Sequence, residues 1–242
     1  GSEIAIAPDG TLYLVDRSLG LYAMRVDGAV LWRATTEGGI WFPAGALSPD
    51  GATLYCYSFT PGSRAQLAAL CAYSTDGTLQ WKFRLPDKLW VSSGPVIGCN
   101  GCIYFGSGDG AEEASFWAIT PGGQLLWRVP AFASGSEEAT IAPDGRVIFY
   151  GDWDIICADH RGRLLWKYRL AGEPVLAAPL CDAEGVVYVF GHRVLAIDEA
   201  GCLLWEVSLP GSFTRIAGPA IGADGTLYVG TFGNPSVLVA IE

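Results

Sequence analysis

The stretch LAIDEAGCLLW, residues 195–205, places a small residue, a glycine and a tryptophan at fixed distances, as Ala196, Gly201 and Trp205. The same spacing, five positions and then four, occurs at four other places along the chain. These copies are Ala23, Gly28 and Trp32; Ala72, Gly77 and Trp81; Ala118, Gly123 and Trp127; and Cys157, Gly162 and Trp166. A motif that returns with the same internal spacing indicates an internal repeat, and a repeat constrains the architecture more than any other feature.

A second motif, a tight turn that contains glycine and precedes an apolar strand, falls between the copies of the first. It occurs six times, and successive copies start 41, 50, 44, 40 and 40 residues apart. The turns are Asp9-Gly10, Asp50-Gly51, Asn100-Gly101, Asp144-Gly145, Glu184-Gly185 and Asp224-Gly225. The longest spacing accommodates an insertion at residues 58–66. The chain is therefore predicted to contain six repeats.

Each repeat is predicted to form four antiparallel strands, named A to D in chain order. In the first repeat, residues 3–7, 11–15, 21–25 and 30–33 are rich in β-branched, aromatic and small residues. Glycine-containing turns connect A to B and C to D, as expected for hairpins. Four antiparallel strands per repeat form one blade of a β-propeller. The sequence therefore predicts an all-β chain, a single β-propeller of six four-stranded blades.

The predicted propeller domain covers residues 1–242, with blades that start near residues 3, 43, 94, 138, 177 and 217. We interpret Gly1 and Ser2 as the remnant of an expression tag. The sixth copy, residues 219–242, stops after strand C, with Ala240 in the position of the motif's alanine. The last blade is therefore predicted to be incomplete, with strand D missing.

The repeated tryptophan has a structural interpretation. Each face of a blade has to be covered by a neighbour, and a large indole fits where that neighbour has little bulk. We therefore expect the tryptophan of each repeat to lie against the glycine and the alanine of an adjacent repeat.

Composition excludes two classes of partner. The chain carries 15 basic and 25 acidic residues, a net charge of −10, without the cluster of Lys and Arg that a nucleic-acid surface needs. No apolar run approaches the roughly 18 residues needed to span a bilayer. We therefore predict no nucleic-acid binding and no membrane insertion, and we expect a monomer.

The repeat resembles the pyrroloquinoline-quinone-type (PQQ-like) propeller repeat. That repeat combines a glycine-led strand ending in tyrosine, a Leu-x-Ala strand, and a Gly-x-apolar-apolar-Trp strand. Residues 195–197 (LAI), 201–205 (GCLLW) and 225–229 (GTLYV) match these three parts. The resemblance covers residues 3–242 and implies the fold.

The resemblance implies more than one function, because the family includes both enzymes and proteins that are not enzymes. The family contains quinone-dependent dehydrogenases, and also outer-membrane assembly lipoproteins and sensor domains of bacterial receptors and kinases. Its enzyme members usually have eight blades, bind the quinone with calcium, and often carry a disulfide between adjacent cysteines. This chain has six repeats and no Cys-Cys pair. We therefore expect no quinone and no other cofactor, with calcium kept as an alternative. The resemblance favours an extracytoplasmic location, periplasmic or secreted.

Antiparallel connectivity sorts the loops onto two faces. The A–B and C–D turns share one face and are short, whereas the B–C and D–A loops share the other and vary in length. Variable loops on a rigid scaffold are where binding usually occurs, so we predict the site on that second face. Residues just before each strand A would surround the central channel. The predicted ligand-binding residues are Trp41, Trp90, Glu137, Glu173 and Arg215.

Two constellations could hold a metal. Asp109, Glu112, Asp152 and Asp154 offer carboxylate oxygens of the kind that calcium prefers, without matching an established calcium loop. Cys99 and Cys102 have the spacing of zinc ligands, but no second pair follows at a usual interval. Because these cysteines flank an Asn-Gly turn, we expect two strand residues that face one another, with a disulfide as the alternative.

The sequence predicts a non-catalytic binding or scaffold module that recognises a protein segment, or a small ligand such as a sugar, on its loop-rich face. Only two histidines are present, His160 and His192, and neither has an evident nucleophile beside it. An enzyme, either a degenerate quinoprotein or a propeller hydrolase or lyase, is the alternative. A third possibility is an engineered or excised propeller fragment without its own ligand.

Overall fold

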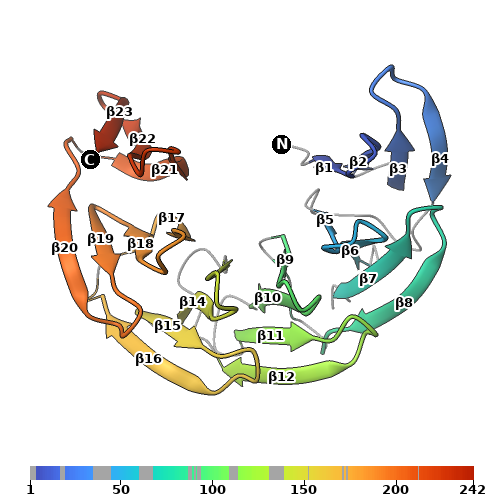
Figure 1. Cartoon of the computed structure of the whole chain (residues 1–242), viewed down its shortest axis with the longest axis horizontal. Helices are drawn as coiled ribbons and strands as arrows, with labels where there is room; N and C mark the ends of the chain where they lie inside the picture. The colour runs from blue at the N-terminus through green and yellow to red at the C-terminus, as the bar shows by residue number, and fades with distance from the viewer. Residues whose placement is uncertain are drawn as a thin grey trace. The chain divides into compact units, whose positions relative to one another are not determined.

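A computed structural model describes most of the chain as antiparallel β-sheet. The described residues are 4–16, 20–34, 45–59, 68–86, 89, 91, 94–108, 114–130, 139–151, 153–170, 172, 174–211 and 213–242. They contain 23 strands in six sheets, and the strand order within each sheet can be followed in Figure 1. In this part of the chain no helix is long and apolar enough to cross a membrane.

The chain divides into two compact units, and the first, residues 1–130, contains three four-stranded sheets. The first sheet consists of β1 (Ile4–Ile6), β2 (Leu12–Asp16), β3 (Gly20–Met24) and β4 (Val30–Ala34). The second consists of β5 (Ala46–Leu47), β6 (Thr53–Phe59), β7 (Ala68–Ser74) and β8 (Leu79–Arg84). The third consists of β9 (Val96–Ile97), β10 (Ile103–Ser107), β11 (Ser115–Ile119) and β12 (Leu125–Pro130).

The second unit, residues 131–242, contains two four-stranded sheets and one of three strands. The fourth sheet consists of β13 (Ala139–Ile141), β14 (Val147–Gly151), β15 (Asp154–Ala158) and β16 (Leu164–Arg169). The fifth consists of β17 (Ala177–Cys181), β18 (Val187–Phe190), β19 (Arg193–Ile197) and β20 (Leu203–Ser208). The sixth consists of β21 (Phe213–Ile221), β22 (Leu227–Gly233) and β23 (Val237–Ile241). The predicted all-β propeller blades, with strand D missing from the last, are confirmed.

The hairpin turns owe their shape to the Asp-Gly motif. The glycine has a positive φ, between +70° and +87° in the copies of both turn types, while the residue before it does not. The aspartate instead accepts a hydrogen bond from a backbone N–H two residues on, as from Thr11 to Asp9 at 2.9 Å and from Ala29 to Asp27 at 3.1 Å. Each residue type therefore has its own role, glycine for the left-handed backbone and aspartate as the acceptor.

The Asn100-Gly101 turn corrects the prediction for the two cysteines around it. Cys99 is an exposed residue of the turn, and Cys102 is buried just before β10. The residue across from Cys102 is Gly98, whose N–H donates to the Cys102 carbonyl at 2.9 Å. The expectation that the two cysteines face one another was wrong because this turn places Cys99 inside the loop. Both are free thiols.

The indole of one repeat lies on the C–D turn glycine of the next. A β-carbon built on Gly77 would lie 2.8 Å from the Trp32 ring, and one built on Gly123 would lie 2.6 Å from Trp81. A β-carbon built on Gly201 would lie 2.8 Å from the Trp166 ring. The predicted indole–glycine contact is therefore confirmed for these three pairs.

A hydrogen bond that the sequence did not reveal fixes each of these indoles. The indole N–H of Trp32 donates to the carbonyl of Thr75 at 2.7 Å, and that of Trp81 donates to Pro121 at 2.9 Å. The Trp166 N–H donates to the carbonyl of Glu199, also at 2.9 Å. Each acceptor belongs to the C–D turn on which the ring lies, so stacking and hydrogen bonding join the same two repeats.

The motif's alanine has a different position from the predicted one. Ala23 pairs with Trp32 across the β3–β4 ladder of its own sheet, and Ala72 pairs with Trp81 in the same way. Directly paired residues of antiparallel strands project to the same face. The prediction that the indole lies on the alanine of an adjacent repeat was therefore wrong, because the small residue makes room for the indole within its own blade.

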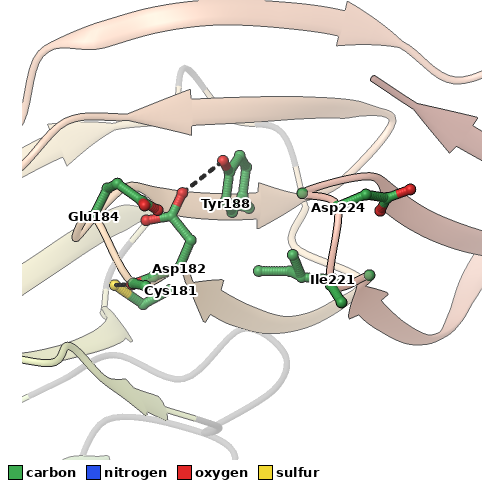
Figure 2. Close-up of a pocket in the computed structure, with 10 residues that line it drawn as sticks. Cys181, Asp182, Glu184, Tyr188, Ile221 and Asp224 are labelled. Carbon is green, nitrogen blue, oxygen red and sulfur yellow. Dashed lines mark hydrogen bonds between the residues drawn. The ribbon is translucent and has the colours of Figure 1, made fainter.

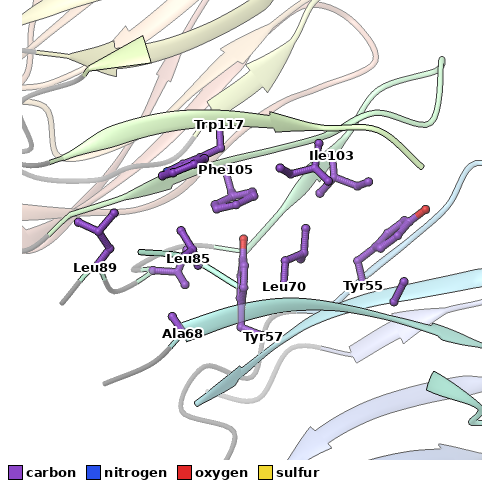
Figure 3. Close-up of a cluster of buried hydrophobic side chains, with 12 residues drawn as sticks. Tyr55, Tyr57, Ala68, Leu70, Leu85, Leu89, Ile103, Phe105 and Trp117 are labelled. Carbon is purple, nitrogen blue, oxygen red and sulfur yellow. The ribbon is translucent and has the colours of Figure 1, made fainter. Parts of the chain in front are cut away.

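The cores lie between the faces of neighbouring sheets within each unit. Figure 3 shows the core between the second and third sheets, where Tyr57 and Leu70 of the second sheet face Phe105 and Trp117 of the third. The Phe105 and Trp117 rings are stacked with centroids 6.2 Å apart, and Tyr57 meets Phe105 edge-on at 5.7 Å. The middle strands β7, β10 and β11 are buried along almost their whole length, because each blade packs face to face against its neighbours.

Candidate functional site

The B–C turns and the ends of strand D are joined by repeated hydrogen bonds. The N–H of Leu170, just after β16, donates to the carbonyl of Trp153 in the B–C turn at 2.9 Å. Leu209 donates to His192 in the same way at 3.0 Å. Because strand D leads into the D–A connection, these bonds place B–C turns and D–A connections on one side of their blade. We call this side, in each blade, the loop-rich face.

Most of the predicted site residues lie outside the described part of the chain. These are Trp41, Trp90, Glu137 and Glu173 among the ligand-binding candidates, and Asp109, Glu112 and Asp152 among the calcium candidates. Of the predicted residues, Arg215 and Asp154 are described. Their placement as a group therefore stays a prediction.

Asp154 is engaged in an ion pair. It is the first residue of β15, and its carboxylate lies 3.2 Å from Arg169 on the paired strand β16. Among the described residues there is no group of three or more His, Cys, Asp or Glu side chains that could hold a metal ion.

Arg215 lies two residues after Phe213, one member of an aromatic pair on the loop-rich face. It belongs to β21, which begins at Phe213, so it lies within a strand and not in the D–A loop where the sequence placed it. The difference arises from register shifts in β21, between Phe213 and Arg215 and again between Ala217 and Ala220, which lengthen strand A. Arg215 is exposed.

The neighbouring aromatic pair links two sheets of the second unit. Phe213 is buried, and the exposed His192 ring, from the B–C turn before β19, lies 5.3 Å from it, centroid to centroid. The buried Phe213 ring thus contacts the exposed His192 imidazole. The exposed Arg215 follows Phe213 by two residues in β21. This arrangement can hold a partner by stacking on the rings and by hydrogen bonds that the guanidinium donates.

Trp153 occupies the B–C turn between β14 and β15 in an unusual conformation. Its φ is +66°, the only positive value of a non-glycine residue in the described chain, and its side chain is 38% exposed. A left-handed backbone is costly for a bulky residue, and such strain tends to persist at functional positions. The sequence included this turn among the variable loops but gave no signal for Trp153 itself.

A cavity lies on the opposite side of the second unit, between the A–B turns of the fifth and sixth sheets (Figure 2). Its volume is about 500 Å³, and Asp182, Glu184 and Asp224 contribute carboxylates to its lining. Tyr188 donates its phenolic hydrogen to Asp182 at 2.8 Å. Burial, reinforced by this hydrogen bond, raises the pKa of Tyr188 to about 12.

The sequence analysis predicted the site on the other face and missed this cavity. The turns that line it, Asp182 to Gly185 and Gly222 to Gly225, are forty residues apart and are ordinary copies of the repeat. Only the adjacency of the two sheets brings them together. An acidic lining of this kind suits a positively charged group.

Comparison with known proteins identifies the family. A family model described as outer membrane protein assembly factor BamB matches residues 113–242. No curated protein matches the chain by sequence.

Solved structures show the same fold. BamB from Moraxella catarrhalis is 16% identical with a TM-score of 0.66, over 98% of this chain and 70% of that one. An inactivated virginiamycin B lyase from Staphylococcus aureus is 15% identical with a TM-score of 0.68, over 98% of this chain and 82% of that one.

A third structure, a protein from Thermus thermophilus described as an oxidoreductase of glucose dehydrogenase type, is 17% identical with a TM-score of 0.53, over 98% and 95% of the two chains. At these identities the likeness to all three is one of fold alone. The family model, by contrast, matches more than half of the sequence. The chain therefore belongs to the PQQ-like β-propeller repeat family described as outer membrane protein assembly factor BamB.

Proposed function

We propose that the chain is a non-catalytic propeller module that binds a protein segment through its loop-rich face. The observation that carries this proposal is the pair formed by the buried Phe213 ring and the exposed His192 imidazole, with the exposed Arg215 two residues further along the same strand. Arginine and aromatic side chains are the types most often found to dominate binding energy at protein interfaces.

Trp153 extends this surface to the fourth sheet of the same unit. Its indole is 38% exposed at the end of a tight turn, where a rigid ring can bind a partner with little loss of conformational entropy. The hydrogen bond from the N–H of Leu170 to the Trp153 carbonyl fixes the backbone of this turn before binding. Pre-organisation of this kind raises affinity without adding contacts.

The family supports a protein partner over a sugar or other small ligand. Its description is that of an assembly factor for outer membrane proteins, and an assembly factor acts on other proteins. The same description supports an extracytoplasmic location for this chain. No bound cofactor is part of the proposal.

The proposal can be tested with peptides selected from a displayed random library against the immobilised chain. Affinities of the selected peptides would be measured by fluorescence anisotropy for the wild type and two variants. Arg215→Ala removes the exposed cation, and Trp153→Gly removes the indole while keeping a backbone that tolerates the positive φ. We expect each variant to weaken binding about tenfold or more, as for loss of an interface anchor.

Arg161→Ala is the matched control, because Arg161 is an exposed arginine in a C–D turn, away from the loop-rich face. It should leave affinity unchanged. Thermal unfolding of each variant would verify that the fold is intact. Selected peptides that bind the Arg215→Ala and Trp153→Gly variants as well as the wild type would contradict the proposal.

A further inference from the structure

The A–B turns of the second unit are copies of one five-residue turn. They occupy residues 142–146, 182–186 and 222–226, between the paired ends of strands A and B. In each turn the N–H of the first residue donates to the carbonyl of the fifth at 2.8–3.1 Å. The N–H of the glycine in fourth position donates back to the carbonyl of the first. A given position of the turn therefore has the same place in each of the three blades.

An arginine fills the space between the first two of these turns. Arg146 is the fifth residue of its turn, and a β-carbon built on Gly185 of the next turn would lie 2.9 Å from its Nη2. Its Nε donates to Asp144 at 2.6 Å, and its Nη1 donates to the carbonyl of Glu199 at 2.7 Å. The Arg146 side chain is 11% exposed. The fourth and fifth sheets thus enclose a guanidinium, and the third residue of the turn supplies its carboxylate.

The next pair of turns keeps that carboxylate and lacks the arginine. The third residue of the second turn is Glu184, and the fifth is Val186, whose side chain is short and uncharged. Gly225 corresponds to Gly185, and a β-carbon built on it would meet nothing within 4 Å. The cavity of about 500 Å³ lies here, with Glu184 and Gly225 in its lining (Figure 2). The place that Arg146 fills one blade earlier is therefore a cavity between the fifth and sixth sheets.

The lining of this cavity carries more negative charge than its counterpart. Asp182 stands where the preceding turn has Ala142, and Asp224 adds a carboxylate from the sixth sheet. No lysine or arginine is among the described residues that line the cavity. All of these residues belong to the second unit. The cavity thus combines an added carboxylate with the loss of the cation that the chain itself places at this position one blade earlier.

The Asp182 carboxylate is held in place and can still accept hydrogen bonds. One of its oxygens accepts the N–H of Val186 at 2.8 Å, and the other accepts the hydroxyl of Tyr188, also at 2.8 Å. A carboxylate oxygen has two lone pairs, so each of the two can accept one further donor. A fixed carboxylate loses little entropy when it binds a ligand.

We propose that this cavity binds the guanidinium group of a ligand, as the preceding pair of turns binds that of Arg146. The group would lie against Gly225 and donate to Glu184 as Arg146 does to Asp144, with Asp182 as a further acceptor. Guanidinium fits this place better than ammonium, because it is planar and directs several N–H donors at carboxylates around its edge. The site goes beyond the proposed function and lies on the side of the unit opposite the loop-rich face.

Blocked amino acids are suitable probes. Acetyl-arginine methylamide carries the guanidinium without charged ends, and acetyl-citrulline methylamide has the same shape with a neutral urea. Titration of the whole chain, followed by the amide NMR signals of residues 182–185 and 222–225, should show saturable shifts with the arginine probe. The citrulline and lysine probes should bind at least about tenfold more weakly, because they lack the charge or the planar set of donors. Equal binding of the arginine and citrulline probes, or shifts confined to other residues, would overturn the proposal.

Free arginine in the same titration distinguishes two sources of the group. Its carboxylate should weaken binding in the acidic cavity if the natural ligand is an arginine residue of a polypeptide. Tighter binding than that of the blocked probe would instead identify a free amino acid as the ligand.

Two substitutions test the position of the group. Glu184→Gln should weaken binding of the arginine probe about tenfold, as for loss of a charge-assisted hydrogen bond. Glu199→Gln is the matched control, since Glu199 is an exposed glutamate of the same sheet outside the cavity lining. Val186→Arg puts an arginine where the preceding turn has Arg146, so the chain's own guanidinium should fill the cavity and abolish probe binding. If the Val186→Arg variant, shown to be folded by thermal unfolding, binds the probe as the wild type does, the assignment is wrong.

Arg215→Ala separates this inference from the proposed function. It removes a cation of the loop-rich face and should leave affinity for the arginine probe unchanged. Val186→Arg should in turn leave the library-selected peptides unaffected. Loss of probe binding in Arg215→Ala would place the guanidinium site outside the cavity, whatever the loop-rich face binds.

Discussion

Gly123 lies under the indole of Trp81 so closely that the two residues act as one unit. A β-carbon at Gly123 would be 2.6 Å from the ring, and the glycine φ is +79°. Two different demands therefore act on the same position, a left-handed backbone and the absence of a side chain. Gly145, with φ +86°, meets only the first demand, because a β-carbon there has nothing within 4 Å.

This pair of glycines allows the two demands to be measured separately. Gly145→Ala should lower the free energy of unfolding by about 1–2 kcal/mol, the cost of a left-handed alanine. Gly123→Ala should lose a further 1–3 kcal/mol, roughly, because the Trp81 ring has to move and its hydrogen bond to Pro121 is disturbed. Urea unfolding of both variants gives the difference. Equal losses would show that the indole contact contributes nothing beyond backbone strain.

At the scale of elements, the turns depend on carboxylates that act as acceptors. A hydrogen bond from the Ser74 hydroxyl, supported by the N–H of Thr78, holds the pKa of Asp76 below its ordinary value. Hydrogen bonds from Ser48 and the N–H of Ala52 do the same for the pKa of Asp50. Because the folded pKa lies below the unfolded one, this stabilisation is present above the unfolded pKa and is lost as pH falls through the folded value.

The urea midpoint of the wild type should therefore fall as pH drops from 5 to below about 4, the ordinary range for carboxyl groups. The Asp50→Asn, Asp76→Asn double variant should show a shallower fall, since an amide keeps the acceptor oxygen but does not titrate. Asn100→Asp is the reverse test, because Asn100 already accepts the N–H of Cys102 at 3.0 Å. It should steepen the pH dependence. An unchanged slope in both variants would contradict this role for the turn carboxylates.

The sequence predicted the features that are set by spacing within one repeat. It did not predict the features that depend on contacts with a neighbouring strand or blade. Strand order, turn positions and the missing fourth strand follow from spacing. The start of β21 at Phe213 was missed because its register shifts leave no mark in the composition. The alanine of the motif was assigned to the wrong blade because spacing cannot tell a cross-strand partner from an inter-blade contact.

The candidate site was less predictable than the elements, for the same physical reason. Arg215 was predicted, but Trp153 stands out only through its backbone conformation, which no residue pattern encodes. The acidic cavity at Tyr188 and Asp224 requires two adjacent sheets.

At the scale of the whole molecule, the chain is a series of sheets that bury apolar faces against their neighbours. Two of the described cores lie in the first unit, around Tyr13 and around Tyr57. Two others lie in the second unit, around Val187 and around Phe190. In repeat proteins stability is close to a sum of each repeat and its nearest interfaces. A local loss should therefore be felt mainly in the unit where it occurs.

Trp166→Ala tests this expectation, because Trp166 packs on the core of the second unit and is held by the carbonyl of Glu199. Emptying an aromatic site of this type costs about 3–5 kcal/mol. Amide exchange, followed by mass spectrometry, should accelerate across β15, β18 and β19 and stay near the wild-type rate across β6, β7 and β10. Trp81→Ala should give the converse pattern, since Trp81 packs on the core of the first unit. If either substitution accelerated exchange equally in both units, the chain would unfold as one cooperative body, and the nearest-neighbour description of its stability would be wrong.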